Sequence, residues 1–197
     1  MNSWIRMALS ALIVVAMICG GTASAHTVAP AQPMRHLTVT VYDYSGVDPR
    51  TLATAQDVAS EVYRRAGIEI EWAEPDGYTD ATRLYVNLLA TEMITPLWIS
   101  KDTVGFATPG SLAATAIYDR IHVLAHQRHV PCGVLLGYVI AHEVGHLLLP
   151  AHSHSDAGVM MASLNMEQAS ERKLRFTSDQ AALMLERLTA SPAVSTH

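Results

Sequence analysis

Charged side chains are scarce in this sequence, and basic ones are scarcer than acidic ones. Lys and Arg number 13 and Asp and Glu number 18 among 197 residues, which gives a formal net charge of −5 with neutral histidines. The densest basic stretch, residues 172–175, is short and follows Glu171. This deficit of positive charge excludes nucleic acid as an expected partner. Since half of the residues are hydrophobic and 16% are charged, the composition excludes a disordered chain and predicts one globular domain.

Cysteine is also rare, with one residue at position 19 and one at position 132. Cys19 follows the bulky Ile18, which does not suit a lipoprotein-type cleavage site, so it is assigned to an export signal. Cys132 would then stand alone after export, which excludes an intramolecular disulfide. Its thiol is interpreted as a small buried side chain at the start of a helix, with contact to a metal or to another chain as the alternative.

The first 25 residues carry the features of a secretory signal peptide. Arg6 precedes an apolar stretch over residues 7–18, and Ala23-Ser24-Ala25 forms a small-residue cleavage site. Cleavage before His26 predicts export to a periplasm or to the extracellular space, without stable membrane insertion afterwards. An uncleaved anchor is the alternative, although the apolar stretch is short for a membrane span. A weaker alternative is copper binding by the amine and imidazole of an N-terminal His26.

Hydrophobic periodicity predicts a folded domain over residues 37–190, between a short tail at 26–36 and another at 191–197. Alternating apolar residues indicate strands, and apolar residues three or four apart indicate helices. Asp48 and Pro49 are suited to the start of the first helix, and Gly67 to its end. The expected elements are a strand at 37–42, a helix at 49–66, strands at 68–72 and 83–89, a short edge strand at 104–107, a strand at 115–123, a helix from about 132 to 148, and a last helix from 177 or 178 to about 190.

A metal-binding pattern lies at the end of the helix expected over 132–148. His142 and His146 are four residues apart, so both imidazoles lie on one helix face and can converge on one ion. Glu143 lies one position round the helix from His142. Its carboxylate can reach a water on that ion, which is the placement of a general base in a zinc peptidase. The spacing therefore predicts a metallohydrolase.

The third ligand is expected from the chain that follows this helix. His152 lies six residues beyond His146, after a Leu149-Pro150 pair that should end the helix and let the chain turn back. His154, only two residues further on, is the alternative third ligand. Other histidines, at positions 122, 126 and 129, are interpreted as part of a solvated connection before Pro131 rather than as ligands.

The motif at 142–152, together with Gly158-Val159-Met160-Met161-Ala162, resembles the metzincin zinc peptidases. Met160 lies eight residues after His152, as in matrixin-like members, and would be the Met-turn residue beneath the metal; Met161 is interpreted as a flexible core side chain. The resemblance implies an α+β fold with a mixed, mostly parallel five-stranded sheet and an edge strand. It also implies a helix after the first strand, a zinc-binding active-site helix, a Met-turn and a C-terminal helix.

The resemblance further implies one catalytic Zn²⁺ held by His142, His146 and His152, with Glu143 as general base. The implied activity is that of a secreted zinc metalloendopeptidase, which hydrolyses peptide bonds in protein or peptide substrates with metal-activated water. The implied substrate would lie antiparallel to the edge strand, against Val104, Gly105, Phe106 and Ala107, and the segment after Met160 would wall its specificity pocket.

Two departures from the family pattern leave an alternative open. Leu149 stands where the family has a glycine in a left-handed turn, although Pro150 should hold Leu149 in an extended conformation instead. In addition, residues 26–36 are too few for a propeptide with a thiol latch. The alternative is a catalytically inactive zinc-binding or interaction module of the same fold.

Overall fold

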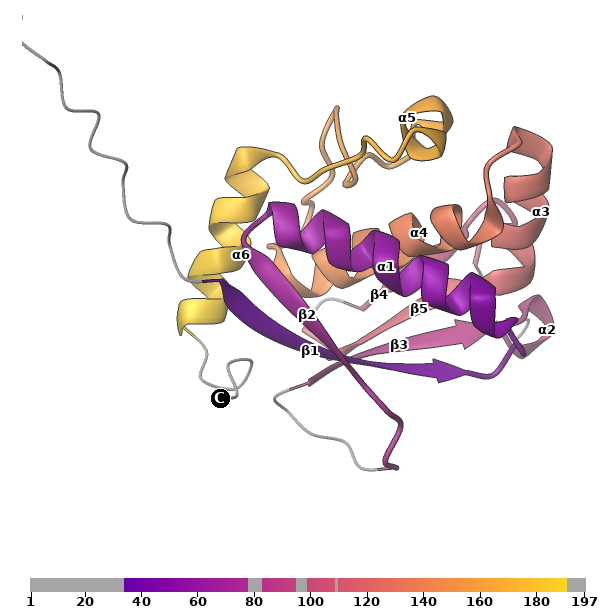
Figure 1. Cartoon of the computed structure of the whole chain (residues 1–197), viewed down its shortest axis with the longest axis horizontal. Coiled ribbons are helices and arrows are strands. Elements are labelled where there is room, and N and C mark those ends of the chain that lie inside the picture. Colours follow the sequence, from indigo (N-terminus) through magenta and orange to yellow (C-terminus); the bar gives the residue numbers. More distant parts are fainter. Residues whose placement is uncertain (1–33, 78–82, 95–98, 109, 191–197) are drawn as a thin grey trace, which may run out of the picture. The chain divides into compact units, whose positions relative to one another are not determined.

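The structure is a computed structural model that describes residues 34–77, 83–94, 99–108 and 110–190 (Figure 1). The expected signal peptide at 1–25, with Cys19 and His26, and the expected C-terminal tail at 191–197 lie outside the described residues. Among the residues that are described, none belongs to a helix of the length and apolarity that a membrane span requires.

The described residues form an α+β fold around one five-stranded, mostly parallel sheet, as the sequence predicts (Figure 1). The strands are β1 (Arg35–Asp43), β2 (Ile68–Ala73), β3 (Arg83–Leu89), β4 (Gly105–Ala107) and β5 (Ala113–Ile117), in the order β2-β1-β3-β5-β4. Neighbouring strands are parallel except β4, which pairs antiparallel with β5. The predicted edge strand is therefore β4, and its outer side has no strand neighbour within the sheet.

Two long helices, α1 (Pro49–Arg65) and α4 (Cys132–Leu148), lie side by side against this sheet (Figure 1). The Asp48 carboxylate caps α1 by accepting hydrogen bonds from the backbone N–H groups of Arg50 and Thr51. The two helices approach closely at Gly137, where an added Cβ would stand 2.6 Å from the Ala55 carbonyl oxygen. A glycine is thus required at this position for α4 to reach its place.

Apolar residues two apart on β1 and β3 contribute to the core. Leu37 and Val39 on β1 and Val86 and Leu88 on β3 are fully buried, as the period of two predicts. The helix α4 is buried along almost its whole length, with fourteen of its seventeen residues in the interior. Because α4 packs against both α1 and the sheet, its position relative to the sheet is fixed. This helix carries the predicted metal ligands His142 and His146.

The predicted strand at 115–123 is wrong in its second half. β5 ends at Ile117, and α3 (Tyr118–Arg128) follows at once. The apolar residues of this stretch fit both the strand period of two and the helix period of 3.6. In the structure, Ile121 and Ala125, four residues apart, are buried and Val123 is 54% exposed, which is a helical pattern. The three histidines at 122, 126 and 129 are exposed as expected, on this helix and its C-cap rather than in a connection.

Three further helices complete the described chain. α2 (Thr91–Ile94) and α5 (Met166–Ser170) are single turns that the sequence does not predict, because they are too short to show a period. α6 (Ser178–Ala190) matches the predicted last helix.

Candidate metal centre

The C-terminal half of α4 presents two imidazoles to a common point. His142 and His146 are both partly buried, and their Nε2 atoms are 3.0 Å apart. Their separation by four residues puts them one above the other on the helix, as predicted.

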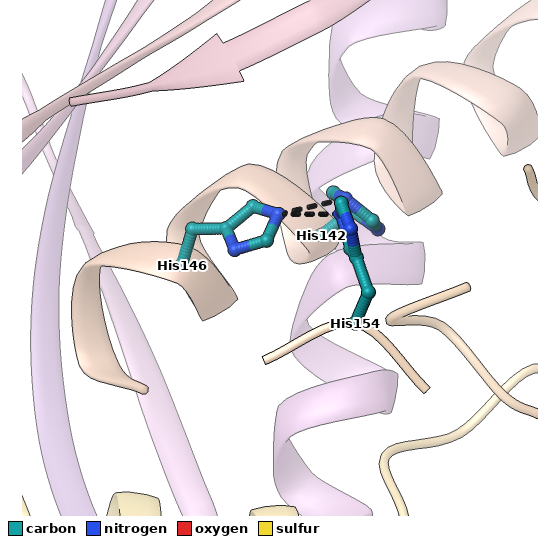
Figure 2. Close-up of side chains that lie close together, drawn as sticks. All are labelled: His142, His146 and His154. Atoms are coloured by element: carbon teal, nitrogen blue, oxygen red, sulfur yellow. Dashed lines mark hydrogen bonds between the residues drawn. The ribbon is translucent and has the colours of Figure 1, made fainter. Parts of the chain in front are cut away.

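A third imidazole, that of His154, reaches the same point from the chain beyond the helix (Figure 2). Its Nε2 atom lies 3.1 Å from that of His146, and one nitrogen from each of the three rings lies within 4.8 Å of the others. In a tetrahedral zinc site with Zn–N bonds of about 2.0–2.1 Å, ligand nitrogens are separated by roughly 3.3 Å. The three rings are thus close to the spacing that one zinc ion needs.

The structure departs here from the predicted third ligand, because His152 is not in this group. His152 is exposed and lines the neighbouring cleft. The reason lies in the path after the helix. Leu149 is extended (φ −96°, ψ 158°), as expected before Pro150, so the chain does not turn back at once. The left-handed residue is His152 itself (φ 63°), and the chain returns two residues later, at His154.

The second ring nitrogens of the two helical histidines are also engaged. His142 Nδ1 lies 2.8 Å from the Val159 carbonyl oxygen, and His146 Nδ1 lies 3.2 Å from Ser153 Oγ. A carbonyl can only accept, so Nδ1 of His142 carries the proton and its Nε2 keeps a lone pair toward the other rings. This is the tautomer that a metal ligand requires, and such outer partners orient ligating histidines.

The neutral state of these two imidazoles also favours metal binding. Burial lowers the pKa of His142. The pKa of His146 is lowered to about 4, mainly by burial and in addition by charge repulsion from His142 and His154. Both imidazoles are therefore neutral near pH 7, as zinc ligands must be. The three-histidine group can hold zinc.

The carboxylate of Glu143 lies beside this group and against the edge strand. Its side chain is 6% exposed, and burial raises its pKa to about 8. At Gly105 on β4, an added Cβ would lie 2.7 Å from Glu143 Oε1. A side chain at position 105 would overlap the Glu143 carboxyl group, so the glycine leaves room for Glu143.

Met160 lies fully buried beneath α4. An added Cβ at Gly145, between the two helical histidines, would stand 2.7 Å from the Met160 sulfur. The turn before it depends on Gly158 (φ 82°), where a Cβ would meet the Arg175 carbonyl at 2.2 Å. Met161, interpreted above as a core side chain, is partly exposed and faces the cleft.

A cleft of about 860 Å³ runs along the three histidines and Glu143. The whole of β4 and the preceding Val104 form one wall, and the chain after Met160, residues 161–164, forms another. The lining of the cleft also includes the apolar side chains of Leu124, Leu135, Val139, Leu164 and Met166. The arrangement places an extended edge, a carboxylate and a metal-binding group along one groove.

Some residues at this centre are not predicted from the sequence. Ser153 is one, and Gln180 is another, because its amide bonds to the chain around His154. The pattern Thr177-x-x-Gln180 is a signal for the start of α6, but it carries no signal for a contact with residues 153–155. Cys132 is half-buried at the start of α4 and is not a member of the histidine group; burial raises the pKa of its thiol.

Neither a family model nor a curated protein matches this sequence. Among solved structures, metalloproteinase-II from Bacteroides fragilis is similar with a TM-score of 0.49 and 14% identity, over 80% of this chain and 55% of that one. The chain thus spans about half the length of that protein. Archaemetzincin from Methanopyrus kandleri is similar with a TM-score of 0.46 and 18% identity, over 78% of this chain and 96% of that one. Similarities of this size do not establish a shared activity.

Proposed function

We propose that this chain is a zinc-dependent peptidase with His142, His146 and His154 as metal ligands and Glu143 as general base. The observation that supports it most is the convergence of three Nε2 atoms next to a buried carboxylate, inside a cleft bordered by an edge strand. Three imidazoles leave a coordination position open, which is the arrangement of catalytic rather than structural zinc.

His142, His146 and His154 would hold the zinc ion, which would act as a Lewis acid and make water nucleophilic near neutral pH. Glu143 takes the proton of the attacking water and returns it to the departing amine. The raised pKa of Glu143 belongs to the metal-free chain; a divalent cation nearby favours the carboxylate and shifts this pKa downward. The imidazole of His142, held by the Val159 carbonyl, keeps its lone pair directed at the metal.

The substrate is proposed to add as a strand antiparallel to β4, with main-chain hydrogen bonds along residues 104–107. Such a peptide runs with its C-terminal end toward Val104, because β4 runs away from that residue. Val104, Leu124, Leu164 and Met166 line both this cleft and a neighbouring depression, together with Asp102 and Ser163, so these four apolar side chains lie near the Val104 end of β4. The peptidase should therefore prefer a large apolar side chain on the C-terminal side of the cleaved bond.

Export is part of the same proposal. The basic, apolar and small-residue regions of residues 1–25 support removal of a signal before His26, in a periplasm or outside the cell. Mass analysis of the protein secreted by its expression host should give a chain that starts at His26. An intact N-terminus would contradict export by cleavage.

The alternative of an inactive module rests on two departures from the family pattern, Leu149 and the lack of a thiol latch. In the structure Leu149 has φ −96°, so its side chain causes no left-handed strain after the helix. This observation removes the main argument against a working site.

The function is tested by incubating the zinc-loaded protein with a mixed peptide library and identifying the cleaved bonds. Glu143→Gln is the matched control, because it preserves side-chain size and the histidine group. We expect near one zinc per chain in both proteins and a loss of cleavage rate of about 10²–10⁴-fold in the variant. Zinc binding without cleavage by the wild-type protein would favour the inactive module instead.

A further inference from the structure

We propose that Gln180 is a positioning residue of the metal centre, which holds the loop around His154 so that its imidazole meets those on α4. This inference deepens the proposed function and rests on His154 as a ligand. His154 is exposed, whereas His142 and His146 are partly buried on a packed helix, so the position of His154 depends on what holds its neighbours.

The Gln180 side chain bonds on both sides of His154. It is 7% exposed, and its Nε2 atom donates to the Ser153 carbonyl at 3.2 Å and to Ser155 Oγ at 3.1 Å. Both N–H groups of the amide are therefore used on the residues that flank the ligand.

The other end of the same amide is fixed to the start of α6. Gln180 Oε1 accepts from the Thr177 backbone N–H at 3.0 Å, and Thr177 Oγ1 accepts from the Gln180 backbone N–H at 3.2 Å. This reciprocal pair is a capping box. Because the Thr177 N–H can only donate and the Ser153 carbonyl can only accept, one orientation of the amide satisfies both.

The loop that Gln180 holds is also tied to the rest of the centre. The Ser155 hydroxyl donates to the Ala157 carbonyl at 2.8 Å, and the Ser155 backbone N–H donates to the Met160 carbonyl at 3.0 Å. Ser153 Oγ contacts His146 Nδ1. The amide of Gln180 thus joins α6 to the chain that connects the third histidine, the outer partner of the second histidine and Met160.

Two substitutions separate this positioning from the capping of α6. Gln180→Glu keeps an acceptor for the Thr177 N–H but cannot donate to Ser153 and places a carboxylate against its carbonyl. Gln180→Met removes the donors without adding charge. Thr177→Ala is the matched control, since it weakens the cap and leaves the Gln180 amide and its donors in place.

The measurement is the zinc affinity of the metal-free, full-length proteins, by competition with a chromophoric chelator, together with the visible spectrum of the Co²⁺ forms. Loss of an outer partner of a metal ligand typically costs 10–100-fold in affinity. We expect a loss of this size and an altered Co²⁺ spectrum in both Gln180 variants. Thr177→Ala should change affinity by less than about threefold while lowering thermal stability as N-cap loss does.

Unchanged zinc affinity and an unchanged Co²⁺ spectrum in folded Gln180→Met would overturn this proposal, as would an equal loss in Thr177→Ala. A wild-type chain that binds no zinc would overturn it together with the proposed function. A chain that binds zinc, responds to the Gln180 substitutions and cleaves no peptide would support the positioning role and refute the peptidase alone.

Discussion

The two halves of the proposed metal centre are built in different ways. The helix α4 supplies His142, Glu143 and His146 from a segment that is buried by α1 and the sheet. The loop beyond it supplies His154 at an exposed position, held by hydrogen bonds of the residues on either side. On the helix, the 3.6-residue period alone brings ligands together. In the loop, the position of the ligand depends on partners distant in the sequence.

This contrast also divides the expected effects of substitution. Changes on α4 are opposed by tight contacts, such as the Met160 sulfur beneath Gly145. Substitutions in the loop disturb hydrogen bonds, each of which contributes on the order of 1 kcal/mol to stability. The loop is thus where the geometry of the third ligand is most easily altered.

The largest effect should come from removing the loop ligand itself. We expect His154→Ala to lower zinc affinity on the order of a thousandfold, more than the 10–100-fold typical of outer partners. His152→Ala, two residues away on the same loop, should stay within about threefold. Zinc competition on both variants measures this, and the opposite ranking would restore His152 as the ligand.

The difference between the helical half and the loop half of the site explains what could be predicted from the sequence. The separate strands, α1, α4 and the shared helix face of His142 and His146 follow from short-range periods, whereas their assembly into one mostly parallel sheet was implied by the family resemblance, and the structure agrees with both. The extended conformation of Leu149 also followed, from Pro150 next to it. Which of His152 and His154 lies beside the two helical histidines did not follow, because it depends on a left-handed turn at His152.

The prediction of a strand at 115–123 is wrong beyond Ile117 for a related reason. A stretch whose apolar residues fit both periods is decided by what lies over it, and here Ile121 and Ala125 face the core. The contact between Gln180 and residues 153–155 joins positions more than twenty apart and leaves no periodic trace.

The next largest effect concerns the buried carboxylate on α4 and depends on pH. In the metal-free protein burial raises the pKa of Glu143 from 4.5 to about 8. Between these values the unfolded state has lost the proton and the folded state keeps it, so stability falls as pH rises through this window. Glu143→Gln has no proton to lose. We expect the variant to gain on the order of 5 kcal/mol at most over the wild type above pH 8, and nothing below pH 4.5.

Chemical denaturation in the presence of a chelator, at pH 4.5, 6.5 and 8.5, measures this difference. The sign of the trend is the sharper test, because relaxation around the carboxylate reduces its size. A stability difference that does not change with pH would show that the Glu143 carboxyl ionises normally in the folded chain.

A smaller effect is expected where the edge strand meets the same side chain. Gly105→Ala would place a Cβ 2.7 Å from Glu143 Oε1 and displace the carboxylate. Since this carboxylate is not a metal ligand in the proposed site, zinc content should remain near one per chain. We expect a 10–100-fold lower kcat/KM on a cleaved peptide, because a displaced general base works poorly. Full activity in this variant would mean that β4 moves to accommodate the added methyl group, and that a glycine at position 105 is not required for the function of Glu143.

The smallest effect returns to the anchoring of α4. The Tyr63 hydroxyl, fully buried on α1, donates to the Ala141 carbonyl at 3.0 Å, directly before the first ligand. Tyr63→Phe removes this bond but keeps the ring contact with Phe176. Loss of one buried hydrogen bond should lower the free energy of unfolding by about 1–2 kcal/mol in a denaturation experiment. Zinc affinity should change by less than about threefold, because tight packing on both sides still holds α4. If zinc affinity instead fell as far as in the Gln180 variants, the helical half would depend on single hydrogen bonds as the loop half does, and the contrast between the two halves would fail.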